Sequence, residues 1–169
     1  MEKDSILVTP LGVKRVNDRI KSLEEKRVEQ TRIIGEAAAQ DADLPENTLF
    51  KQAREIVQFQ IPQERKVLLN KLSRLVVISE ESPELGLHPE DEVWLGSSVQ
   101  IDIGGDIEQW RIVGHDEGNP DNFLVSYDAP MAISMLGKKV GDVCKINDRF
   151  SFTIISVERD MTLFAPIEE

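Results

Sequence analysis

Cysteine and histidine are scarce in this sequence of 169 residues, which holds one cysteine, Cys144, and two histidines, His88 and His115. A single cysteine cannot close an intrachain disulfide, and a multi-cysteine zinc site is excluded with it. The two histidines lie far apart in the sequence, which argues against a histidine-based metal site. We therefore expect a reduced, cytoplasmic protein.

Long hydrophobic runs are also absent, because every apolar stretch is far too short to span a bilayer. The first ten residues, MEKDSILVTP, have no apolar segment behind a basic start, so we expect no secretory signal. A phosphate-binding P-loop, a G-x-S-x-G motif and a Ser/His/Asp cluster are missing as well. These absences predict a protein without a membrane partner that is not an enzyme by itself.

Positive charge is scarce in the second half of the chain. Residues 1–80 carry 14 lysines and arginines against 13 acids, whereas the remaining 89 carry 6 against 18, and the net charge is −11. Nucleic-acid affinity rests largely on contacts between basic side chains and phosphates. Direct DNA or RNA binding by the second half is therefore disfavoured, and a basic protein partner is favoured.

The composition changes near residue 80, and two different structural periods lie on either side. We predict the α+β class, with an antiparallel α-helical coiled-coil hairpin over 1–79 and a linker over 80–92. A small antiparallel β domain with a short helix is predicted over 93–169. The linker assignment rests on the Glu-, Pro- and Ser-rich stretch SEESPELGLHPEDE.

The helical half shows a heptad seam, with spacings that alternate between three and four residues. Its first helix is expected to begin at Thr9-Pro10, an N-cap followed by proline, and to run for roughly 40 Å at 1.5 Å per residue. A phase slip interrupts the second helix at Pro62, where we expect a kink or a π-type turn because proline cannot donate to the carbonyl of Gln58. The predicted seam residues are Val13, Val16, Ile20, Leu23, Arg27, Gln30, Ile34 and Ala37, then Phe50, Ala53 and Val57, and after the slip Ile61, Leu68, Leu72 and Leu75.

The second half alternates with a period of two, which predicts strands. Gly104-Gly105 predicts a hairpin turn between the first two. The predicted strands cover 98–103, 109–113, 123–127, 143–146 and 150–157, and a short helix is expected over 130–136. Trp94, Trp110 and Cys144 are interpreted as core residues, and His115 as part of a solvated loop.

Three acids, Asp41, Asp43 and Glu46, lie within six positions at the predicted turn between the two helices. One interpretation is a capping box, in which Asp43 caps the second helix and Glu46 reaches back. It leaves Asp41 unexplained, as well as the placing of the charges at the far end of a long rod. A second interpretation is a site for a hard divalent cation, for which a partner supplies the remaining oxygen ligands.

The residues around this turn resemble a motif of the Gre family of transcript cleavage factors, GreA and GreB. DLPEN at 43–47, with Phe50 following, resembles D-L-x-E-N-x-x-Y. WRIVG at 110–114 with Asp116-Glu117 is similar to the family's F/Y-R-I-V-G-x-D-E segment. DAPMA at 128–132 followed by LGKKVGD at 136–142 is similar to its D-S-P-M/L-A and L-L-G-K-x-V-G-D signature. The three motifs occur in the family's order and spacing.

The resemblance implies a function. The helical hairpin would enter the secondary channel of bacterial RNA polymerase, and an FKBP-like C-terminal domain would dock at the channel's rim. Asp43 and Glu46 would hold a Mg²⁺ ion jointly with the polymerase and stimulate cleavage of backtracked RNA, so the protein activates in trans and contacts the RNA 3′ end only within that complex. The implied support residues at the tip are Asp41, Asn47, Phe50 and Arg54, and the implied docking residues are Asp128, Ala129, Pro130 and Met131. The ion would not be tightly bound by this protein alone.

The sequence also departs from the family pattern. Ala39, Ala42 and Phe50 stand where Arg, Gly and Tyr are usual, and Ala129 and Ile133 replace Ser and Arg in the docking region. These changes favour, as an alternative, a divergent paralogue that occupies the channel and inhibits or modulates the polymerase without promoting cleavage. A coiled-coil adaptor for an unrelated basic partner is a third hypothesis.

Overall fold

The computed structural model describes residues 5–40 and 47–166. It divides into two compact units, Lys14–Arg74 and the described part of Met1–Val13 with Leu75–Glu169. The boundaries differ from the predicted 1–79, 80–92 and 93–169, because the start of the chain pairs with residues that follow the helices. The predicted α+β class, a helical hairpin followed by a β domain with a short helix, is confirmed.

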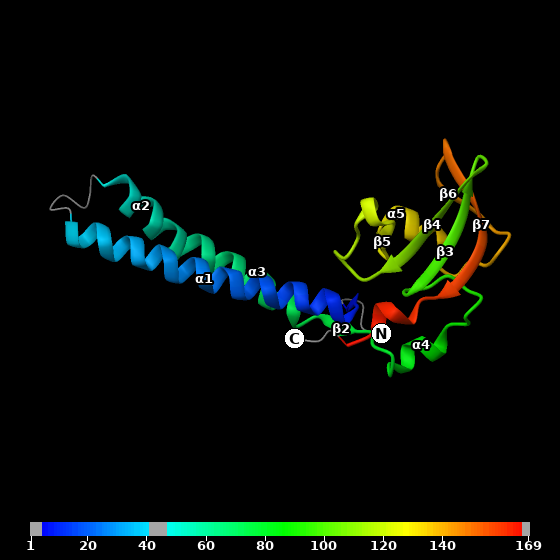
Figure 1. Cartoon of the computed structure of the whole chain (residues 1–169), viewed down its shortest axis with the longest axis horizontal. Coiled ribbons are helices and arrows are strands. Elements are labelled where there is room, and N and C mark those ends of the chain that lie inside the picture. The colour runs from blue at the N-terminus through cyan, green and yellow to red at the C-terminus, as the bar shows by residue number, and fades with distance from the viewer. Residues whose placement is uncertain (1–4, 41–46, 167–169) are drawn as a thin grey trace. The chain divides into compact units, whose positions relative to one another are not determined.

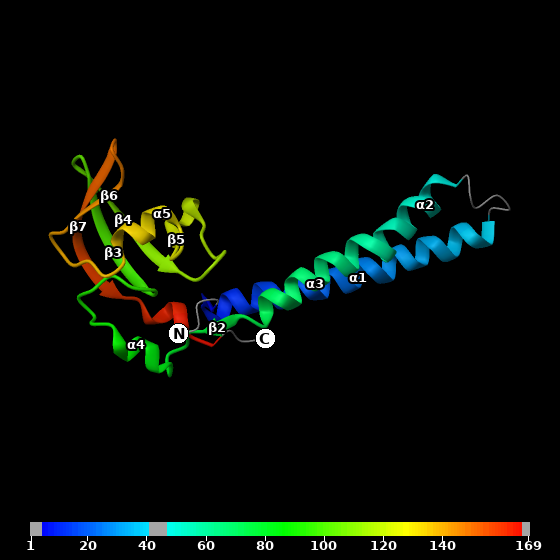
Figure 2. The ribbon, with the colours of Figure 1, turned by 180° about the vertical axis from the view of Figure 1, so that it is seen from behind.

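The helical unit is a pair of antiparallel rods. α1 (Pro10–Gln40) lies alongside the second rod, which consists of α2 (Thr48–Glu55), the π-helical turn η1 (Ile56–Gln60) and α3 (Ile61–Leu72) (Figures 1 and 2). The buried residues of the seam are Val16, Leu23, Ala53 and Ile61, with Leu23 only 2% exposed, and its other apolar residues are half-buried. Arg27 is an exception, because it is exposed and pairs with Glu24 on the same helix.

The predicted π-type turn is confirmed, and the spacing of the buried residues explains it. Ala53 and Ile61 are both buried and lie eight residues apart, whereas two turns of α-helix take about seven. One wider turn absorbs the extra residue, and the N–H of Ile61 accordingly donates to the carbonyl of Ile56, five positions back. Pro62 follows directly and has no N–H to offer Gln58.

Gly35 is a weak point of α1, because it stands inside a helix without any packing reason. A Cβ atom added there would meet nothing within 4 Å. Gly35→Ala is therefore expected to raise the free energy of unfolding by about 1 kcal/mol, since alanine loses less backbone entropy on entering a helix. Urea denaturation followed by circular dichroism measures it. Gly12→Ala in the same helix is the matched opposite, because its Cβ would lie 2.2 Å from Glu117 Oε1 and should destabilise the protein.

The base of the second unit contains a parallel strand pair that the sequence did not predict. β1 (Ile6–Val8) pairs with β2 (Leu75–Val77), so Leu75 starts a strand and is not the seam residue we predicted. The predicted linker also folds, because it forms the short helix α4 (Pro83–Leu87) and buries Leu85. These segments pack with the 3₁₀ turn η3 (Met161–Phe164) around a small core. The buried residues of this core are Leu7, Ile78, Leu85, Leu95 and Phe164.

The same unit contains a five-stranded sheet, in the order β5-β4-β3-β7-β6. The strands are β3 (Ser97–Ile103), β4 (Asp106–Val113), β5 (Leu124–Ser126), β6 (Val143–Asn147) and β7 (Phe150–Arg159). The hairpin at Gly104-Gly105 is confirmed. The prediction of an antiparallel sheet is wrong for one pair, because β5 runs parallel to β4. The loop 114–123, with its 3₁₀ turn η2 (Pro120–Asn122), returns the chain before β5 begins.

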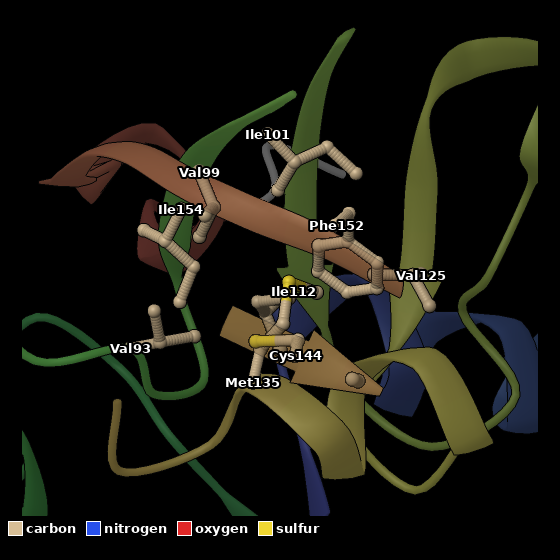
Figure 3. Packing of buried hydrophobic residues seen from close by; sticks show 10 residues of the cluster. Val93, Val99, Ile101, Ile112, Val125, Met135, Cys144, Phe152 and Ile154 are labelled. Atoms are coloured by element: carbon tan, nitrogen blue, oxygen red, sulfur yellow. The ribbon is translucent and has the colours of Figure 1, made fainter. Parts of the chain in front are cut away.

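The main core lies between this sheet and α5 (Pro130–Met135), the predicted short helix (Figure 3). Cys144 is fully buried there, as predicted, and burial raises the pKa of its thiol. Both tryptophans are half-buried: Trp110 packs against this core, as predicted, whereas Trp94 packs against the smaller one. None of the helices in the described part of the chain is long and apolar enough to cross a membrane.

Candidate functional site

The three acids of the predicted tip, Asp41, Asp43 and Glu46, lie outside the described residues. Asn47, the first described residue after them, is the N-cap of α2. Its Oδ1 accepts a hydrogen bond from the N–H of Phe50 at 3.0 Å. The interpretation of Asp43 as this helix's N-cap is therefore wrong.

The other two residues predicted to support the tip are on α2. Phe50 is half-buried and contributes to the helical seam. Arg54 is exposed, and its Nε donates to Gln58 Oε1 at 3.2 Å, along the same rod and towards η1. Asn47 and Phe50 are thus joined by a hydrogen bond, whereas Arg54 bonds to a residue farther from the tip.

The predicted docking residues 128–131, here called the docking segment, follow β5 and include the first two residues of α5. The N–H of Ala129 donates to Ser126 O at 2.9 Å and closes a tight turn, and α5 then begins at Pro130. Ala129 and Met131 pack partly against the main core, whereas Asp128 and Pro130 are exposed. Ile133, where the family has Arg, is 60% exposed on α5. The segment presents one acid flanked by apolar side chains on a fixed turn.

Glu117 is a buried acid, for which the sequence indicated only membership of the Asp116-Glu117 motif. It is 1% exposed, and its carboxylate accepts from the N–H of Thr9 at 2.8 Å and from the Thr9 hydroxyl at 2.6 Å. Gly12 and Gly114 make room for it, since a Cβ on either would lie 2.2 Å from Oε1. The side chain thus ties the loop after β4 to the residue before α1. The Thr9 hydroxyl is the donor of the second of these two hydrogen bonds.

His115 lies in the loop after β4, as predicted, but it is half-buried and its ring contacts two carboxylates. Its Nδ1 lies 2.5 Å from Asp128 Oδ2, and its Nε2 lies 3.4 Å from Asp116 Oδ2. Burial raises the pKa of Asp128, but the hydrogen bond with His115 and the other polar groups around the carboxylate outweigh it, so the pKa lies below the ordinary value. A histidine thirteen residues before the docking segment carries no periodic signal that could have revealed this contact.

The capacity of this protein to hold a metal ion depends on which ligand side chains lie together in the fold and on the donor atoms of the tip. Within 5–40 and 47–166, no three His, Cys, Asp or Glu side chains come together as a metal site. Asp43 and Glu46 offer carboxylate oxygens, which are the ligands that Mg²⁺ prefers. Two carboxylates leave most of an octahedral shell to waters and other ligands, so the donor set fits an ion shared with a partner.

Comparison with known proteins gives consistent results. Residues 88–159 match the family described as transcription elongation factor, GreA/GreB, C-term. Transcription elongation factor GreA of Nautilia profundicola is 37% identical over 114 residues, which covers 66% of this chain and 67% of that protein. GreA of Clostridium botulinum is 31% identical over 167 residues, covering 94% and 98%. Among solved structures, GreA factor homolog 1 of Thermus thermophilus is 22% identical with a TM-score of 0.38, covering 91% of this chain and 99% of that one.

Proposed function

The chain belongs to the GreA/GreB family of transcription elongation factors, and on that premise we propose that it binds bacterial RNA polymerase and stimulates cleavage of backtracked RNA. In this proposal the helical unit enters the polymerase's secondary channel. The polymerase performs the hydrolysis, and this protein activates it in trans.

One observation carries the proposal: the two helical rods are joined by a connection with three carboxylates. α1 alone has 31 residues, which corresponds to about 46 Å at 1.5 Å per residue. Asn47 is the N-cap of α2, so the Asp43 carboxylate does not hold that position. A rod of this length that ends in acids is suited to deliver negative charge into a deep, narrow channel.

Asp43 and Glu46 would share a Mg²⁺ ion with the polymerase, whose own ligands would complete the shell. When bound, such an ion supplies Lewis acidity and a water of lowered pKa as the nucleophile. The role of this chain's residues is to place two carboxylates at the end of the rod. Asn47 and Phe50 would support them by fixing the first turn of α2.

The docking segment would contact the rim of the channel. Its exposed Asp128 and Pro130, together with Ile133, offer an acid within an apolar surface. Such a surface is complementary to a basic side chain with apolar groups around it, and we expect the polymerase to supply one at this contact. Any contact with DNA would be indirect, because this half of the chain is strongly acidic.

The test uses elongation complexes of RNA polymerase stalled in a backtracked state, with radiolabelled RNA and Mg²⁺. The protein is expected to accelerate removal of the RNA 3′ end, and the same RNA without polymerase should stay intact. Unchanged cleavage kinetics in the presence of saturating protein would contradict the proposal.

A second candidate function follows from the departures at the tip. Ala39, Ala42 and Phe50 replace the Arg, Gly and Tyr of the family pattern, so this chain lacks the cation of that Arg and the hydroxyl of that Tyr, two groups suited to contact RNA or water. A channel-occupying inhibitor would leave intrinsic cleavage unaccelerated and suppress the cleavage promoted by an authentic GreA. A protein that fails to bind the polymerase at all would instead be an adaptor for another partner.

A further inference from the structure

The acid of the docking segment is held from outside that segment. Asp128 Oδ2 lies 2.5 Å from His115 Nδ1, and the two side chains are 41% and 29% exposed. The contact therefore lies at the surface, where an acid without such a partner would sample several rotamers. In the family's F/Y-R-I-V-G-x-D-E segment, His115 occupies the variable position.

The backbone that carries His115 is fixed on both sides. Its N–H donates to Leu7 O at 3.0 Å, and the preceding residue, Gly114, accepts from the Ser126 hydroxyl at 2.7 Å. Two residues later, Glu117 is locked to Thr9. The imidazole is thus presented by a rigid loop, which can determine where the Asp128 carboxylate points.

The Nδ1 of His115 is the donor in its contact with Asp128, because an ionised carboxylate can only accept a hydrogen bond. Asp116 Oδ2 lies 3.4 Å from Nε2, so carboxylates face both ring nitrogens. The lowered pKa of Asp128 means that its carboxyl is ionised at neutral pH. An ionised acid in a fixed orientation is ready to receive a cationic group without first losing rotamer entropy.

We propose that His115 is a positioning residue for polymerase docking: it holds the Asp128 carboxylate in the orientation that receives a lysine or arginine side chain of the polymerase. The inference rests on the proposed function for the identity of the partner. It adds a residue whose role is to pre-organise the contact, with Asp128 making the contact itself.

A double-mutant cycle tests the proposal, with His115→Ala, Asp128→Ala and their combination. Affinity for core RNA polymerase is measured by displacement of a fluorescently labelled wild-type protein. We expect about a tenfold loss for Asp128→Ala, a loss of about three- to fivefold for His115→Ala, and no further loss when both are combined. His115→Gln, which retains an N–H donor, should recover most of the affinity.

His88→Ala is the matched control, because His88 is the other half-buried histidine and stacks on Trp94 at 4.2 Å, a contact that does not involve Asp128. It should leave the affinity unchanged. Thermal midpoints of all variants separate a positioning role from lost folding, and we expect those of His115→Ala and His115→Gln to agree.

Three results would overturn the proposal. Additive losses in the double variant would mean that His115 does not act through Asp128. A normal affinity of Asp128→Ala would mean that the acid makes no contact worth positioning. A loss in His115→Ala that Gln does not recover, together with a lowered thermal midpoint, would make His115 structural only. If the wild-type protein itself does not bind the polymerase in this assay, the proposed function is refuted as well. That outcome is distinct from the three above, in which the wild-type protein binds.

Discussion

Replacing both tip carboxylates, Asp43→Ala with Glu46→Ala, is expected to lower the stimulated rate of transcript cleavage by about 100-fold or more, to the level of polymerase alone. Alanine removes both oxygen ligands that this protein would contribute to the shared Mg²⁺. A preorganised charge at a metal is difficult for solvent to replace, which is why the expected effect is large.

Binding to the polymerase should survive the same change, because the docking segment and the described helical seam contain neither residue. The measurement combines single-turnover cleavage of radiolabelled RNA with displacement of labelled wild-type protein. Glu55→Ala is the matched control, since Glu55 is an exposed acid of α2 that belongs neither to the motif nor to the tip. A double variant that cleaves as fast as wild type would remove Asp43 and Glu46 from the mechanism.

Glu117→Ala is expected to lower the free energy of unfolding by about 3 kcal/mol. The N–H of Thr9 would lose its acceptor while staying buried, and an orphaned buried group of this kind costs about 1–3 kcal/mol. The Thr9 hydroxyl would lose its partner too, and the space between Gly12 and Gly114 would become a cavity.

Urea denaturation followed by tryptophan fluorescence measures this loss. Glu117→Gln should cost less, because the amide oxygen can still accept from the Thr9 N–H. Glu158→Ala, an exposed acid on β7, is the matched control and should change the stability by less than about 0.5 kcal/mol. Gly114→Ala should be as damaging as Glu117→Ala, since its Cβ would also lie 2.7 Å from the Cα of Val8. A Glu117→Ala protein as stable as wild type would show that the carboxylate does not anchor Thr9.

Local periodicity determined most of the architecture. Spacings of three and four residues place Leu23, Ala53 and Ile61 on a buried helical seam, and the separation of eight positions between the last two requires the π-turn before Pro62. Alternation around Gly104-Gly105 likewise determines the β3–β4 hairpin. In each case the partners lie close in the sequence, so the pattern of apolar residues contains the information.

Tertiary structure alone decided the contacts that join distant segments. The pairing of β1 with β2, and the parallel direction of β5, depend on where the chain returns and not on any local pattern. The same holds for the burial of Glu117 beside Thr9, 108 residues away, and for the contact of His115 with Asp128. A surface carboxylate and a buried one are identical letters in the sequence, because only the folded neighbours determine which of them loses its water.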